Sequence, residues 1–151
     1  MDFSSPTRIP FKLVRKTADE TVNNSTVLQN DNELKLAVLA NEVWYIEAVI
    51  IATILAASDF KWHWTMPALA EFYGLGHEEF PYNNFSSYFE LSATTSIEAV
   101  AAPETKVCRM QGLYIGGANG GDLQLQWAQN AAAVEDTKVL ANSHIRAYKV
   151  N

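Results

Sequence analysis

Cysteine, basic residues and long apolar runs are scarce in this sequence, and each scarcity excludes a class of protein. Cys108 is the only cysteine in 151 residues, so neither an intrachain disulfide nor a cysteine-based zinc site can form. The longest apolar run, Val43–Ala57, contains Glu47 and is shorter than the ~20 residues that a membrane helix needs. Residues 1–10 lack the apolar segment of a signal peptide. We therefore expect a soluble protein that is made in the cytoplasm and binds no membrane.

Basic charge is also in short supply. The formal net charge is −6, with 11 Lys and Arg against 17 Asp and Glu, and the one modest basic cluster is Lys12, Arg15 and Lys16. A nucleic-acid partner requires clustered Lys and Arg, so we expect none. The charge is uneven: residues 1–16 are net basic, whereas residues 71–104 contain six glutamates (Glu71, Glu78, Glu79, Glu90, Glu98 and Glu104) and no Lys or Arg. Two solvated surfaces are the simplest interpretation of this asymmetry.

The hydrophobic pattern has the two-residue period of β-strands. Leu34, Leu36 and Val38 alternate with polar or small residues, and Pro, Gly and Asn clusters separate the periodic segments. The pattern predicts about eight to ten short strands, the signature of a β-sandwich or jelly roll. The predicted strands are 34–38, 43–55, 61–66, 85–93, 94–102, 106–115, 122–129, 137–140 and 143–150.

The expected fold is therefore all-β: an antiparallel, jelly-roll-like β-sandwich with an extended N-terminal arm. We assign residues 1–16 to the arm and first strand, and residues 17–151 to a single domain. We expect 43–55 to be a long strand covered on both faces, forming a hairpin with 61–66. One helical turn is predicted at 68–73. The glycine-rich segment 116–121 is interpreted as a hairpin loop whose glycines adopt positive φ.

Catalytic and metal-binding patterns are absent from the sequence. His63, His77 and His144 lack the spacing of a zinc protease, and Gly116–Gly121 is not followed by the Lys-Ser/Thr of a phosphate-binding loop. No nucleophilic serine stands in a GxSxG context. We expect no enzymatic activity, no cofactor and no metal.

Tryptophans and glutamines supply the candidates for binding. Trp44 and Trp127 are predicted to lie in the core, with Leu125 beside them, whereas Trp62 and Trp64 remain candidates for an interface because tryptophan is favoured at binding hot spots. A polar, uncharged strand face suited to subunit contacts is formed by Gln124, Gln126 and Gln129.

Two stretches carry a family resemblance: VRKTADETVNNSTVLQNDNELKLAVLANEVWYIEAVI at 14–50 and GGDLQLQWAQNAAAVEDTKVLANSHIRAYKV at 120–150. They resemble a widespread group of small phage structural proteins and tail-protein modules. The shared marks are K-x-A-D-E-T-V-x-N-S-T-x-L-Q-x-D, N-E-x-W, L-Q-x-x-W-A-Q-N and L-x-x-S-x-x-x-A. Residues 68–106 depart from the group. The resemblance implies a β-sandwich virion component without catalysis.

From this resemblance we expect a bacteriophage virion structural protein, with a self-assembling capsid decoration (cement) protein as the first hypothesis. The alternative is a tail or fibre module that binds a host receptor or glycan, and a small hydrolase is a weaker third. The expected partners are other copies of the chain, in a homotrimer, and virion proteins such as the major capsid protein. We expect the arm to reach a neighbouring molecule through Phe3, Arg8, Ile9, Phe11 and Lys12.

Overall fold

The computed structural model describes residues 9–79, 95–97 and 104–150, with side chains described at 9–74 and 104–150. These residues form strands and connecting segments without a helix, so they contain no helix that could cross a membrane. The strands are β1 (Phe11–Arg15), β2 (Glu20–Val22), β3 (Gln29–Val38), β4 (Val43–Ile54), β5 (Phe60–Thr65), β6 (Glu71–Glu79), β7 (Thr95–Ile97), β8 (Glu104–Ile115), β9 (Gly121–Ala128), β10 (Thr137–Val139) and β11 (His144–Lys149).

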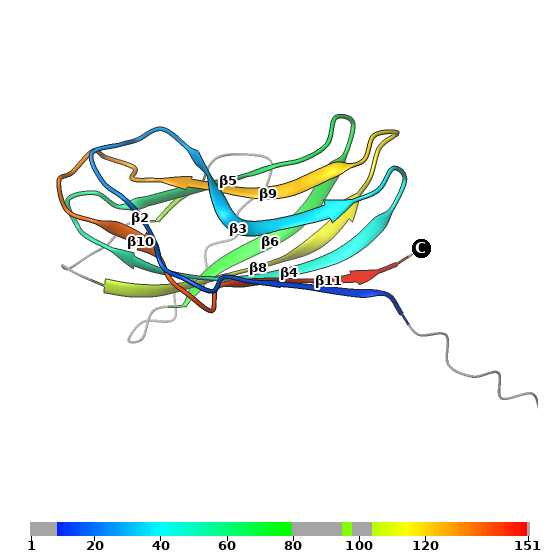
Figure 1. The fold of residues 1–151 in the computed structure, drawn as a ribbon, viewed down its shortest axis with the longest axis horizontal. Coiled ribbons are helices and arrows are strands. Elements are labelled where there is room, and N and C mark those ends of the chain that lie inside the picture. The colour runs from blue at the N-terminus through cyan, green and yellow to red at the C-terminus, as the bar shows by residue number, and fades with distance from the viewer. Residues whose placement is uncertain (1–8, 80–94, 98–103, 151) are drawn as a thin grey trace, which may run out of the picture.

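The strands form two antiparallel sheets packed face to face (Figure 1). In sheet A, β4 is central: β8 and then β6 lie on one side, and β11 and β10 share the other side end to end. Strand β1 pairs with β11, and β2 pairs with β10. Sheet B has the order β3-β9-β5-β7. The predicted all-β sandwich is confirmed.

Strand β4 shows why the sequence forms a sandwich. Its even-numbered residues from Trp44 to Ile54 are all buried and point between the sheets, and its odd-numbered residues are exposed or half-buried. The length of this strand was predicted, but not the partial exposure of its outer face. Continuous apolar composition does not distinguish a strand covered on both faces from one with an apolar outer face.

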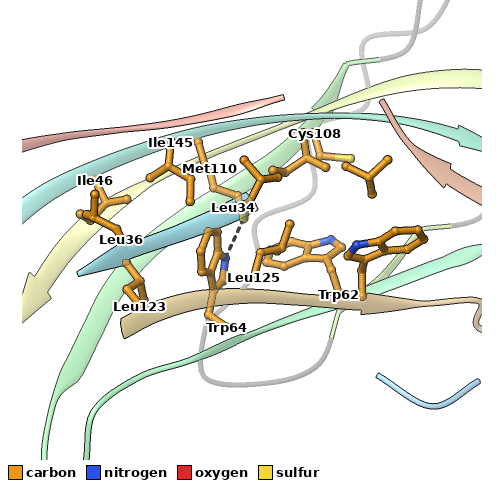
Figure 2. Packing of buried hydrophobic residues seen from close by; sticks show 14 of the residues in the cluster. Leu34, Leu36, Ile46, Trp62, Trp64, Cys108, Met110, Leu123, Leu125 and Ile145 are labelled. Atoms are coloured by element: carbon orange, nitrogen blue, oxygen red, sulfur yellow. Dashed lines mark hydrogen bonds between the residues drawn. The ribbon is translucent and has the colours of Figure 1, made fainter. Parts of the chain in front are cut away.

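The core lies between the two sheets (Figure 2). Sheet B contributes Leu34, Leu36, Trp62, Trp64, Leu123, Leu125 and Trp127, and sheet A contributes Trp44, Ile46, Cys108, Met110 and Ile145. The predicted burial of Trp44, Leu125 and Trp127 is confirmed, with exposed fractions of 2%, 0% and 0%.

The strand pairing differs from the prediction. β4 belongs to sheet A and β5 to sheet B, so the expected hairpin between them does not form. The segment 116–121 likewise crosses from β8 in sheet A to β9 in sheet B. Alternation identifies a strand and its buried face, but two strands on either side of a short turn can lie in opposite layers and still bury the same residues.

The glycines of this crossing are needed for close packing and not for positive φ. No described glycine has positive φ; the positive values occur at Asn24, Asn41, Asp59, Leu69 and Asn142. A Cβ atom built on Gly117 would lie 2.5 Å from the carbonyl oxygen of Leu69. The conformational role predicted for the glycines was therefore wrong.

The middle of the chain also differs from the prediction. The helical turn expected at 68–73 does not form, because Glu71 begins β6 and Leu69 has positive φ. The strand expected at 85–93 lies outside the described residues. Of the strand expected at 94–102, β7 accounts for Thr95–Ile97.

Candidate functional site

The polar residues of the first shared motif meet in a buried ion cluster. Lys16 follows β1, Glu20 begins β2 and Asp31 lies in β3. The Lys16 ammonium donates to Glu20 Oε2 at 2.6 Å and to both carboxylate oxygens of Asp31 at 2.9 Å. The side chains of Lys16 and Asp31 are 1% and 0% exposed, and that of Glu20 is 12% exposed. We call these three residues the Lys16 cluster.

Sheet B contributes further hydrogen bonds to Asp31. The main-chain N–H groups of Glu33 and Leu34 donate to Asp31 Oδ1 at 3.0 and 2.8 Å, and Trp127 Nε1 donates to Oδ2 at 3.1 Å. Gln124 Nε2 donates to the main-chain oxygen of Asp31 at 2.9 Å. The β3–β9 register is irregular between Asn30 and Lys35, so Asp31 fills the position where the ladder is interrupted.

The electrostatics of the cluster favour an ammonium ion at rest. Burial disfavours the charged form of Lys16 and acts to lower its pKa, but the hydrogen bonds and charges of Glu20 and Asp31 outweigh burial and raise the pKa. Two carboxylates therefore share one buried ammonium ion.

The second shared motif, N-E-x-W, forms another local network. The Glu42 carboxylate accepts hydrogen bonds from Leu39 N, Trp44 Nε1 and Lys149 Nζ, each at 2.9 Å. Burial acts to raise the pKa of Glu42, but these three donors outweigh it and lower the pKa from 4.5 to about 2. This glutamate joins the β3–β4 turn to β11.

The two C-terminal motifs also contribute hydrogen bonds that hold turns and strands in place. Gln129 Oε1 accepts from Ser25 N and Ala133 N, and its amide donates to the Glu135 carbonyl at 2.8 Å. Ser143 Oγ accepts from Ile51 N at 2.9 Å. The residues that define the resemblance thus hold turns and sheets together.

The outer face of sheet A has a different character. Phe11, Tyr148, Tyr45, Leu113 and Tyr73 lie in register on five adjacent strands. Phe11 and Tyr73 are 50% and 62% exposed, Tyr45 and Tyr148 are both 37% exposed, and the Phe11 and Tyr148 rings lie 5.1 Å apart. We call this line of side chains the aromatic row. It is the candidate functional site.

A polar line lies directly beside the aromatic row. Arg146, Glu47 and Gln111 occupy adjacent positions on β11, β4 and β8. Arg146 Nε lies 3.6 Å from Glu47 Oε2, and the Tyr45 hydroxyl donates to Gln111 Oε1 at 3.1 Å. Together with Arg109 and Val49, these residues line a hollow of about 100 Å³. The face therefore combines exposed rings with charges of both signs.

Of the residues predicted to form the contacts of the arm, the structure describes three, and they differ in exposure. Ile9 is 63% exposed, and Phe11 belongs to the aromatic row. Lys12 is engaged within the chain: its ammonium lies 4.3 Å from the centre of the Trp44 ring and donates to the Ala37 carbonyl at 2.6 Å. Phe3 and Arg8 lie outside the described residues.

The other residues predicted to form an interface are buried or half-buried in the structure. Trp62 and Trp64 are 3% and 4% exposed because they share the inward face of β5, and Trp64 Nε1 donates to Met110 Sδ at 3.2 Å (Figure 2). Gln124 and Gln129 are buried and satisfy main-chain groups. Gln126 is half-buried and donates to Asn30 Oδ1. The expected glutamine face is therefore not a free contact surface.

Sequence reasoning missed the aromatic row because its residues are far apart in the chain and meet only through strand pairing. The alternation does place Tyr45 on the face of its strand opposite to Trp44 and Ile46. This was the one sign in the sequence that Tyr45 is exposed. Within the described part of the chain, no group of three or more His, Cys, Asp and Glu residues is placed to hold a metal ion.

Comparisons with known proteins identify no family. Neither a protein-family model nor a curated protein sequence matches the chain. A solved structure of Eiger TNF from S. frugiperda aligns over 94% of both chains with a TM-score of 0.46 and 10% identity. A structure of infectious bursal disease virus, Gx strain, aligns over 95% of this chain and 38% of that chain, with a TM-score of 0.25 and 10% identity. Both TM-scores are below 0.5, so these likenesses carry no functional argument.

Proposed function

We propose that this chain is a non-enzymatic structural protein of a bacteriophage virion that assembles with copies of itself, as a trimer, and decorates the capsid by binding the major capsid protein. The motif resemblance at 14–50 and 120–150 supports the virion assignment. The observation that carries self-assembly is the aromatic row on the outer face of sheet A.

Exposed aromatic side chains in a continuous line are unfavourable in water and valuable at an interface. Tyr and Phe are enriched in the centres of protein interfaces, and contiguous apolar patches mark binding surfaces. The polar line of Arg146, Glu47 and Gln111 beside the row supplies charges of both signs, which a partner surface can match.

The strand edges support the same proposal. In the described part of sheet A, β1 pairs with β11 alone and β6 with β8 alone, so each presents an outer edge. Unpaired edges are sites of further association, and closed symmetry is a common way to cover them. The aromatic row runs from one of these edges to the other.

Light scattering combined with size-exclusion chromatography tests the proposal. We expect the full chain to be oligomeric and the double variant Phe11→Glu/Tyr73→Glu, at the two most exposed rings of the row, to be monomeric and folded. The matched control is Val27→Glu/Val134→Glu, because these valines are 74% and 72% exposed but lie outside sheet A. The control should keep the oligomeric state of the wild type.

The location in the virion requires the particle itself. Electron microscopy of purified virions should show the chain on the capsid surface, with the aromatic row between neighbouring copies. A chain that is monomeric both in solution and on the particle contradicts the proposal. A monomer found at the tail that binds host glycans would instead support the receptor-binding alternative.

A further inference from the structure

The Lys16 cluster brings an amine, a carboxyl group and a second carboxyl group together in a buried site. We propose that Lys16 and Asp31 condense to an amide, an intramolecular isopeptide bond, with Glu20 as the proton carrier. This inference does not depend on the proposed virion function.

The geometry places the two reacting groups in contact. Lys16 Nζ is 2.9 Å from each carboxylate oxygen of Asp31, so it lies opposite the carboxyl carbon between them. Both side chains are almost fully buried, which restricts them to this arrangement and excludes competing water. Holding two reactants in such an arrangement is equivalent to raising their concentration to ~10⁵–10⁸ M.

The surroundings of Asp31 match the charge that develops during the reaction. Attack by Nζ on the carboxyl carbon places negative charge on the carboxyl oxygens. Oδ1 receives two main-chain N–H groups, from Glu33 at 3.0 Å and Leu34 at 2.8 Å. A pair of fixed N–H donors of this kind stabilises a tetrahedral intermediate. Trp127 Nε1 contacts the other oxygen, Oδ2, which is the one that leaves.

The proton inventory balances without any external reagent. Glu20 Oε2, 2.6 Å from Lys16 Nζ, accepts one proton from the ammonium ion and leaves a neutral amine. The amine attacks the Asp31 carboxyl carbon, the C–N bond forms and the C–Oδ2 bond breaks. Oδ2 departs as water after taking the proton held by Glu20 and a second proton from the attacking nitrogen. An ammonium and a carboxylate become an amide and one water molecule, and Glu20 returns to its carboxylate form.

Burial favours the product. The resting cluster keeps an ammonium ion and two carboxylates away from water, and each buried ion carries a desolvation cost. Condensation replaces one ion pair by a neutral amide and leaves Glu20 accepting from Asn32 N at 3.0 Å. The bond joins the end of β1 in sheet A to β3 in sheet B, in a chain whose single cysteine allows no disulfide.

Intact mass spectrometry of the denatured full-length protein tests this directly. We expect a mass lower by one water molecule than the sequence mass, with or without Met1. Trypsin should then release residues 16–35 as one peptide, uncleaved after Lys16, lighter by one water and closed by the Lys16–Asp31 link. A protein with the full sequence mass overturns the proposal.

Three variants identify the atoms involved. Lys16→Arg keeps the positive charge but cannot form the amide, so we expect its full sequence mass. If this variant is still lighter by one water, the dehydration lies elsewhere and the proposal is wrong. Asp31→Asn should lose ammonia in place of water, because the amide nitrogen becomes the leaving group. Glu20→Gln should leave most molecules unlinked; linkage equal to that of the wild type would overturn the role of Glu20. Mass is read on denatured protein, so differences in stability among the variants do not obscure the result.

Discussion

Asp31 connects the end of β1 with β3 and β9, and so joins the two sheets. Its carboxylate accepts from Lys16 beside β1, from Trp127 on β9 and from the backbone of its own strand. Loss of a buried charge partner is more damaging than loss of an exposed one, because the remaining groups have no water to replace it.

We expect Asp31→Ala to lower the free energy of unfolding by about 3–5 kcal/mol, because the variant leaves the buried Lys16 ammonium without this partner. The comparison variant is Asp136→Ala, whose ion pair with Lys138 is 3.5 Å long and whose side chain is 44% exposed. That variant should cost less than about 1 kcal/mol. Urea titration followed by tryptophan fluorescence measures both, and equal losses would show that Asp31 is not a central residue.

Glu42 makes stability depend on pH in the acid range. Its pKa in the folded protein is about 2, against 4.5 for the free side chain, because Leu39 N, Lys149 and Trp44 outweigh the effect of burial. A folded-state pKa below the unfolded one means that the carboxylate stabilises the protein above pH 4.5, and that this contribution is lost as the pH falls toward 2.

We therefore expect Glu42→Gln to cost about 1.5–3 kcal/mol at neutral pH, the range for hydrogen bonds to a charged group. The difference from wild type should shrink as the pH is lowered from 4.5 to 2. Unfolding curves at several pH values in this window measure it, and a difference that stays constant would contradict the assignment.

For single residues, the sequence predicts which are polar and turn-forming, but not which of them are buried together. Lys16, Glu20 and Asp31 stand in a polar, turn-rich stretch that looks solvent-exposed. Trp127, their fourth partner, is about a hundred positions away, and only the pairing of β3 with β9 brings it to them.

Strands themselves are largely predictable from the sequence, whereas their pairing is not. The periods at 43–55, 106–115 and 122–129 correspond closely to β4, β8 and β9, whereas the period at 34–38 covers the second half of β3. The sequence contains no local signal that β8 and β9 belong to opposite sheets, because a turn of the same composition can join strands within a sheet or between sheets. The aromatic row was missed for the same reason.

The crossing between β8 and β9 yields a prediction at the element scale. Gly117→Ala would place a methyl group 2.5 Å from the rigid carbonyl oxygen of Leu69. We expect this overpacking to cost about 1–3 kcal/mol and to disturb the start of β6. Gly121→Ala is the matched control, since its nearest neighbour is the Pro67 ring at 3.2 Å, which can move slightly. The midpoint of thermal unfolding should stay close to wild type in Gly121→Ala and fall in Gly117→Ala. A larger fall in Gly121→Ala would refute the packing argument.

For the whole molecule, the first strand expected within residues 1–16 forms as β1, but it belongs to the sandwich and not to a separate arm. Strand β1 is hydrogen-bonded to β11, the Pro10 carbonyl accepts from Lys149 N, and Lys16 is buried. Residues 9–16 thus belong to the sandwich.

We propose that residues 1–8 make the contact with a neighbouring virion protein. Their deletion should leave the circular dichroism spectrum and unfolding midpoint unchanged and weaken binding to undecorated particles. Arg8→Glu should weaken binding less, and mainly at low salt, because salt screens exposed charges. Lys12 is unsuitable for this test, since its contact with Trp44 links it to the fold. Binding of the shortened chain at full strength would contradict the proposal.

The antiparallel pairing of β1 with β11 also determines how the molecule bears tension. Phe11 lies opposite Tyr148 and Arg15 opposite His144, so the outer ends of both strands leave the sheet at the same side (Figure 1). A force that draws these two ends apart loads the β1–β11 hydrogen bonds one after another, so β1 separates from β11 residue by residue. Peeling from Phe11 first breaks the exposed contact of Lys12 with the Ala37 carbonyl of β3, and it then reaches Lys16, whose attachment to Asp31 in the opposite sheet is buried. The Lys16 cluster is therefore the mechanical stop of the sandwich.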